Sequence, residues 1–215
     1  MAIDARNEIL ARVRAAIGGA ASAERATKEW LALPRDYRRG SSHTELELIE
    51  QLIDRLHDYD AHVVEVARAD LPATVLRLLE ARGLPRMVVP VGLASGILPT
   101  GYEFALDTGL SAVELDRCEG VLTEAALAIA ETGTLVLQNV PGQGRRATSL
   151  VPDYHLCLVD VASIVGSVPE AMERLQPTAG LATTFISGPS ATADIEMTRI
   201  KGVHGPRFLD VVLYR

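Results

Sequence analysis

Cysteine is scarce in this sequence, which has two cysteines among 215 residues. Cys118 and Cys157 lie far apart and form no Cys-x-x-Cys pair, so they cannot assemble a four-thiolate zinc or iron–sulfur site. His43, His57 and His62 lack the spacing of a shared metal site. We therefore expect no metal and no cofactor bound by this chain.

Long apolar runs and excess positive charge are also missing. No segment approaches the roughly 18 unbroken apolar residues of a membrane helix, and residues 1–17 lack the apolar centre of a signal peptide. The net charge is −7 and the sequence pI is near 5.3, which argues against non-specific nucleic-acid binding. We expect a cytoplasmic protein.

Two common catalytic motifs are absent as well. The sequence has no Gly-Lys-Ser/Thr phosphate loop and no Gly-x-Ser-x-Gly, which argues against nucleotide hydrolysis and against an α/β-hydrolase nucleophile. The Gly142-x-Gly144 pair lacks the third glycine of a dinucleotide fingerprint.

Hydrophobic residues make up 48% of the chain and aromatic residues only 4%, so the core consists of Leu, Val, Ile and Ala. Short β-branched runs alternate with helical patterns, which predicts a mostly parallel sheet covered on both faces. The expected strands are 61–67, 86–91, 134–138, 154–159, 183–186 and 208–214. The expected helices are 4–17, 44–56, 71–81, 169–175 and 192–201, with a turn or short helix at 125–130.

Residues 1–42 are predicted to form an N-terminal helix and arm, and residues 43–215 an α/β domain. The helix at 4–17 is amphipathic, and the polar connection after it contains Trp30 and a small arginine cluster. Two interpretations of the arm remain: it is ordered only by packing, or it packs on a partner chain.

Residues 183–206 predict a strand, a small polar turn and a helix that ends at Gly202, the position of a left-handed cap. Free N–H groups at such a helix start favour a carboxylate or phosphate. An ordinary capped turn explains the pattern equally well. The candidate anion-binding residues are Ser187, Gly188, Ser190, Ala191, Thr192 and Asp194.

A second cluster comprises residues 130–134 and 142–149. Glu131 is a candidate base or nucleophile, and Arg145 and Arg146 are candidate clamps for an anion. His204 is a further catalytic candidate, because it lies beside Gly205 and follows the predicted anion-binding helix. The candidate residues around Glu131 are Thr132, Gly133 and Thr134.

The two clusters meet only if strand 134–138 runs antiparallel to its neighbours. That arrangement puts residues 142–146 at the opposite rim of the sheet. Otherwise the clusters form separate sites.

The chain resembles the lactate utilization protein C family, the LUD domain. The matching stretches are Ala-Ile-Ala-Glu-Thr-Gly-Thr-Leu-Val-Leu at 128–137, Gly-Arg-Arg-Ala at 144–147 and Ser-Leu-Val-Pro-Asp-Tyr-His at 149–155. Residues 184–196 and the Gly-Val-His-Gly-Pro at 202–206 complete the resemblance.

This resemblance implies a three-layer α/β/α fold of the type shared by glucosamine-phosphate deaminase (NagB), ribose-phosphate isomerase (RpiA) and coenzyme A transferases. It also implies a role in a system that oxidises L-lactate to pyruvate, whose iron–sulfur clusters reside in partner proteins. Whether the chain is an oligomer stays open.

Two functional hypotheses follow. In the first, the chain is a subunit or accessory protein of this lactate system and binds iron–sulfur protein subunits and a small carboxylate. In the second, it is a free-standing enzyme on a phosphorylated, folate or coenzyme A-linked metabolite, with Glu131 as base or nucleophile.

Overall fold

The computed structural model describes residues 2–18, 22–94, 96–192, 200–201 and 204–215. The chain divides into two compact units, Met1–Tyr37 and Arg38–Arg215.

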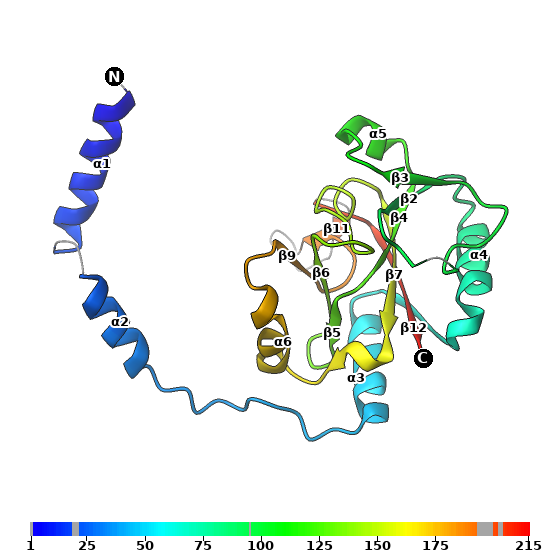
Figure 1. Ribbon diagram of the computed structural model, residues 1–215, viewed down its shortest axis with the longest axis horizontal. Coiled ribbons are helices and arrows are strands. Elements are labelled where there is room, and N and C mark those ends of the chain that lie inside the picture. Colours follow the sequence, from blue (N-terminus) through cyan, green and yellow to red (C-terminus); the bar gives the residue numbers. More distant parts are fainter. Residues whose placement is uncertain (1, 19–21, 95, 193–199, 202–203) are drawn as a thin grey trace. The chain divides into compact units, whose positions relative to one another are not determined.

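The first unit contains the helices α1 (Ala2–Ala16) and α2 (Ala23–Ala32), drawn in blue in Figure 1. The sequence predicted α1 but gave residues 23–32 as a polar connection, which is wrong. The Ser22 side chain accepts a hydrogen bond from the Arg25 N–H at 3.1 Å, and Arg25 pairs with Glu29 one turn later at 2.8 Å. This N-cap and ion pair stabilise a helix that buries none of its side chains.

Six strands in the described part of the second unit form an all-parallel sheet, ordered β1-β12-β7-β4-β2-β3. Their bounds are β1 (His62–Val66), β12 (Phe208–Tyr214), β7 (Tyr154–Asp160), β4 (Gly120–Glu124), β2 (Met87–Pro90) and β3 (Phe104–Asp107). The central strands are nearly continuous runs of buried apolar residues, as expected where both faces are covered. The predicted parallel sheet is confirmed.

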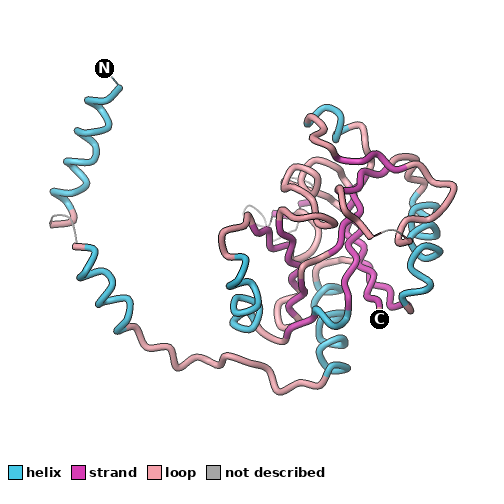
Figure 2. The backbone as a smooth tube through the Cα atoms, viewed as in Figure 1, coloured by secondary structure: helices cyan, strands magenta, loops and turns pink. Residues whose placement is uncertain are grey.

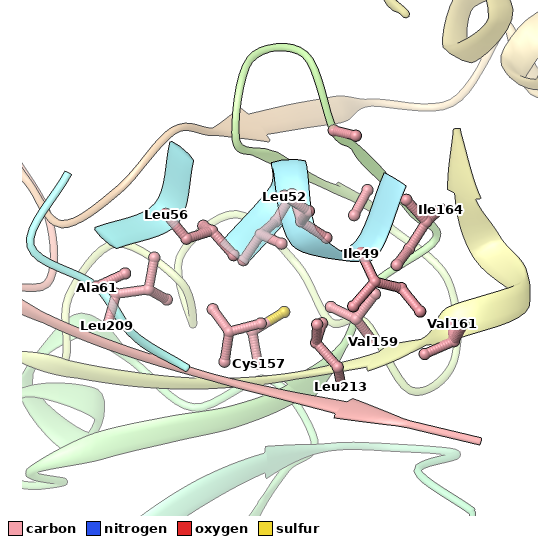
Figure 3. Packing of buried hydrophobic residues seen from close by; sticks show 14 of the residues in the cluster. Ile49, Leu52, Leu56, Ala61, Cys157, Val159, Val161, Ile164, Leu209 and Leu213 are labelled. Carbon is pink, nitrogen blue, oxygen red and sulfur yellow. The ribbon is translucent and has the colours of Figure 1, made fainter. Parts of the chain in front are cut away.

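Helix α4 (Leu71–Arg82) covers one face of this sheet, where Val75 and Leu79 pack with Leu156 and Val212. Helix α3 (Glu45–Asp58) covers the other face. Figure 3 shows the side chains of α3 pointing toward the sheet. The labelled α3 residues are Ile49, Leu52 and Leu56, and the labelled sheet residues include Cys157, Val159, Leu209 and Leu213.

A second, mixed sheet packs on the same face as α3 and has the order β8-β5-β6-β9 among the described residues. Its strands are β5 (Leu127–Ile129), β6 (Thr134–Gln138), β8 (Ile164–Val165) and β9 (Thr183–Ile186). β6 pairs antiparallel with both β5 and β9, while β5 and β8 are parallel. β6 therefore runs antiparallel to its neighbours, which is the condition stated above for the Glu131 and Ser187 clusters to meet.

Helix α6 (Val168–Leu175) covers the outer face of the mixed sheet, where Ala171 and Leu175 pack against Leu127 and Val136. In Figure 2 the helices α4 and α6 lie on opposite sides of the magenta strands. The remaining short elements are α5 (Ala112–Asp116), η1 (Arg68–Asp70), η2 (Val161–Ser163) and η3 (Gln176–Thr178). No helix in the described ranges has the length and apolar character needed to cross a bilayer.

Two further element predictions are wrong. Residues 125–130, expected as a turn or short helix, contain strand β5, whose small and apolar side chains are buried between α6 and the core. The predicted helix at 192–201 begins and ends in strands, because β10 (Ala191–Thr192) pairs antiparallel with β11 (Ile200–Lys201). Its middle, with Asp194, lies outside the described residues.

Candidate functional site

A cavity of about 300 Å³ lies between strand β9 and the amino-terminal ends of β7 and β12. Residues 184–191 and 204–206 form one wall, and His155 and Leu209 come from the second positions of β7 and β12. Arg146 and Ser149 complete the lining. This volume is at the lower end of the range for small-molecule sites.

Arg146 supplies the positive charge at the cavity. Its Nη1 donates to the backbone oxygen of Ser149 at 3.3 Å and to the Ser149 hydroxyl at 3.2 Å. Ser149 is buried, so it fixes the end of an otherwise exposed side chain. The other guanidinium N–H groups of Arg146 have no hydrogen-bond partner among the described residues, which leaves them able to bind an anion.

His155 is the most buried polar residue of the lining, with 1% of its surface exposed. Burial, with a smaller contribution from the positive charge of Arg146, lowers the pKa of His155 to about 4. Its Nε2 lies 2.8 Å from the Thr123 hydroxyl oxygen, and that oxygen lies 3.8 Å from the Cys157 sulfur. Burial raises the pKa of Cys157 to about 12. A neutral imidazole therefore faces the cavity at neutral pH, backed by an uncharged hydroxyl and thiol.

A row of hydroxyl groups joins the Glu131 cluster to the cavity wall. The Thr134 hydroxyl lies 2.7 Å from that of Thr132 and 2.8 Å from that of Ser187. Thr134 opens β6 and Ser187 follows β9, so the antiparallel β6–β9 pairing brings them together. The two clusters predicted from the sequence are neighbours.

The glycines of both clusters make room for helix α3. A Cβ atom on Gly133 would lie 2.7 Å from the Arg55 Cβ, and one on Gly188 would lie 2.4 Å from the Tyr59 Cβ. Both glycines also have positive φ, 59° and 85°. Close approach to the end of α3 explains these glycines without any ligand.

Ser190 connects the loop after β9 to the segment before β12 by two hydrogen bonds. Its N–H donates to the Pro206 oxygen at 2.8 Å, and its hydroxyl oxygen accepts from the His204 N–H at 3.1 Å. Ser190 and Ala191 line the cavity with His204. The loop after β9 and the segment before β12 therefore close one wall as a unit.

Arg145 lies away from the cavity. Its Nε and Nη2 donate to the two carboxylate oxygens of Asp107 at 2.8 and 2.9 Å, and Nη2 also donates to the Leu110 oxygen. These bonds hold the pKa of Asp107 below its usual value. Arg145 and Arg146 are adjacent in sequence but serve different parts of the fold.

Glu131 and Thr192 are not among the cavity residues. The Glu131 carboxylate accepts from Arg38 Nη2 at 3.0 Å and is 43% exposed. Thr192 is in strand β10. Among the described residues, no group of three or more His, Cys, Asp or Glu has an arrangement able to hold a metal ion.

His155 and Thr123, which pairs with its ring, were not predicted as site residues, and Ser149 was included only as the last residue of the second cluster. The sequence feature that could have indicated a site here is a polar residue, His155, in a strand whose next positions are apolar.

Comparisons with known proteins agree with this α/β fold. The family model described as the LUD domain matches residues 112–214. A solved structure of a DUF162 family protein from Deinococcus radiodurans is similar, with a TM-score of 0.71 and 36% sequence identity. The alignment covers 80% of this chain and 99% of that one. The fold and this family match define an α/β protein of the LUD-domain class.

Two relatives extend this result to most of the chain. A protein of Deinococcus radiodurans named lactate utilization protein C is 43% identical over 171 residues, which cover 78% of this chain and 79% of that protein. A protein of the same name from an Exiguobacterium species is 30% identical over 222 residues, covering 97% and 95% of the two chains. The chain belongs to the lactate utilization protein C family.

Proposed function

We propose that this chain is a subunit or accessory protein of a system that oxidises L-lactate to pyruvate, and that it binds a small carboxylate in the cavity beside β9. The observation that carries the ligand proposal is the Arg146 guanidinium, held by Ser149 in the lining of this cavity. The place in lactate utilization is supported by the name that the relatives bear. A cytoplasmic location is part of the same proposal.

The cavity offers the groups that a small organic acid needs. The guanidinium of Arg146 has the planar donor geometry that matches a carboxylate. The lining also contains Ser187, Ser190 and His204. Leu209 and Phe185 supply apolar surface for a short carbon chain. With about 300 Å³, the cavity suits a metabolite of a few carbon atoms.

Isothermal titration calorimetry of the purified chain with L-lactate and pyruvate tests the ligand proposal. We expect Arg146→Gln to weaken binding at least about tenfold, because hydrogen bonds to a charged group contribute roughly 1.5–3 kcal/mol. Arg77→Gln is the matched control, since Arg77 is exposed on α4, across the large sheet. Equal binding by the wild type and both variants would contradict the proposal.

The partner proposal concerns the first unit. Its helices expose large apolar side chains, among them Ile9, Val13, Trp30 and Leu31. Such exposure is typical of surfaces that bind another protein. We expect the partners to be the subunits that carry the iron–sulfur clusters. Co-purification from cells that express the whole system tests this, with Trp30→Ala and Leu31→Ser predicted to reduce recovery of the partners.

The alternative is a free-standing enzyme, a proposal that includes kinship with the glucosamine-phosphate deaminase, ribose-phosphate isomerase and coenzyme A transferase fold. The hydroxyl row from Thr132 through Thr134 to Ser187 favours it, since this row joins the Glu131 loop to the cavity wall. The enzyme hypothesis requires the Glu131 carboxylate to release its ion pair with Arg38. A Glu131→Gln variant with full activity on an identified metabolite would exclude Glu131 as base or nucleophile.

A further inference from the structure

The two ring nitrogens of His155 differ in their hydrogen bonding. Nε2 is paired with the Thr123 hydroxyl, whereas Nδ1 has no hydrogen-bond partner among the described residues. Within that part of the chain, only Gln51 Oε1 is a fully buried side-chain nitrogen or oxygen without a partner. Nδ1 is not one of these fully buried unpaired atoms, and His155 lines the cavity beside β9.

The imidazole is also held in place. Thr123 is fully buried on β4, opposite Cys157 in the β4–β7 register, and its hydroxyl lies between the imidazole and the thiol. If Thr123 donates to Nε2, then Nδ1 carries the proton and is a donor. If Nε2 donates to Thr123, then Nδ1 is an acceptor. In either case the imidazole that lines the cavity keeps one ring nitrogen without a partner among the described residues.

Arg146 and His155 both line the cavity of about 300 Å³ beside β9. An acid of two or three carbon atoms whose carboxylate binds Arg146 lies in the same small cavity as the imidazole, which brings its second carbon within reach of His155. In 2-hydroxy and 2-oxo acids that carbon bears an oxygen. Such an oxygen is able to accept from, or in the hydroxy acid also donate to, the free ring nitrogen.

We infer that His155 makes this cavity selective for short carboxylic acids with an oxygen on the second carbon, over the same acids without that oxygen. The inference rests on the proposed function, because it requires a carboxylate at Arg146. His155 is a specificity residue in this account and takes no part in a covalent step. A plain acid leaves Nδ1 without a ligand partner, which is the kind of mismatch that polar sites reject.

Calorimetry with L-lactate, pyruvate and propionate tests this selectivity, since the three acids share a three-carbon chain. We expect wild-type protein to bind lactate or pyruvate at least about tenfold more tightly than propionate, because an unmatched buried polar group costs roughly 1–3 kcal/mol. In the His155→Leu variant we expect lactate and pyruvate to bind as weakly as propionate. His155→Asn, whose amide nitrogen lies near the position of Nδ1, recovers part of the preference.

Propionate is the internal control, because its binding shows that a variant is folded and keeps the Arg146 site. If wild-type protein binds lactate, pyruvate and propionate equally, and Arg146→Gln weakens all three, the selectivity inference is overturned while the proposed function stands. If no acid binds, both are overturned. If His155→Leu does not fold, ¹⁵N NMR of the wild-type imidazole decides: a shift of Nδ1 with lactate alone supports the inference, and equal shifts with lactate and propionate overturn it.

Discussion

The hydroxyl oxygens of Thr134 and Ser187 lie 2.8 Å apart, although 53 residues separate them in the chain. This bond joins the start of β6 to the residue that follows β9. It connects the loop of Glu131 to the wall of the cavity in which we place a small carboxylate. The two stretches that the sequence presented as separate candidates therefore form one structural unit.

A double-mutant cycle with Thr134→Val and Ser187→Ala measures this connection. Thr134 is 5% exposed, so removal of its hydroxyl leaves little access for replacement water. We expect a coupling free energy of about 0.5–1.5 kcal/mol in urea unfolding at neutral pH. Additive effects of the two substitutions would show that the bond contributes nothing to the fold.

Gly188→Ala should destabilise the protein by about 2–4 kcal/mol, because the substitution combines a positive φ with a close contact to Tyr59. Gly83→Ala isolates the backbone contribution, since Gly83 also has a positive φ but nothing within 4 Å of the added carbon. We expect it to cost about 1 kcal/mol. Gly180→Ala, at an open position where φ is not positive, should be nearly neutral. Equal effects at Gly188 and Gly83 would contradict the close packing of α3.

The buried His155 predicts a specific loss of stability in mild acid. Its pKa is lowered to about 4 in the folded protein, against about 6.5 in an unfolded chain. Between these values the unfolded state binds more protons, so the free energy of unfolding decreases as the pH falls from about 6.5 toward 4. The decrease approaches 1.4 kcal/mol per pH unit for this one group.

Chemical unfolding of wild-type protein and His155→Gln at several pH values measures this contribution. The variant lacks the titrating ring, so its stability should change less over the same interval. Parallel pH profiles for the two proteins would show that His155 does not carry the effect.

Asp107→Asn should weaken the attachment of the loop that carries Arg145. The substitution removes the charged partner of a bidentate pair whose carboxylate is 4% exposed. We expect a loss of about 3 kcal/mol in unfolding free energy. The lowered pKa of Asp107 means that the pair stabilises the wild type above the unfolded pKa of about 3.9 and loses this effect as the pH falls through the lower folded value. A variant as stable as the wild type at neutral pH would contradict this account.

Much of the fold follows from local pattern. The strands β6, β9 and β12, which are rich in β-branched and aromatic residues, were predicted with the bounds that the structure has. The alternation of strands and helices indicated the parallel sheet, because such connections favour parallel pairing. An antiparallel β6 was left open as the condition for the two clusters to meet, and the structure meets this condition. The expected consequence, residues 142–146 at the opposite rim, is wrong for Arg146, which lines the same cavity as Ser187.

Long-range partners were beyond the reach of these patterns. Arg145 and Arg146 look equivalent in sequence, but only Arg145 finds the buried Asp107, 38 residues away. The charge order of residues 192–201 favours a helix, whereas the observed β10–β11 pairing brings its two ends together. The location of His155 in the cavity depends on which face of β7 packs against the mixed sheet, and this is a tertiary property.

A crystal structure of the chain with bound L-lactate is the most direct measurement for the ligand claim. We predict the carboxylate within hydrogen-bond distance of Arg146, inside the cavity formed by the loop after β9 and the segment before β12. A lactate bound instead at the Arg145–Asp107 pair, or an empty cavity at saturating lactate, would contradict the account.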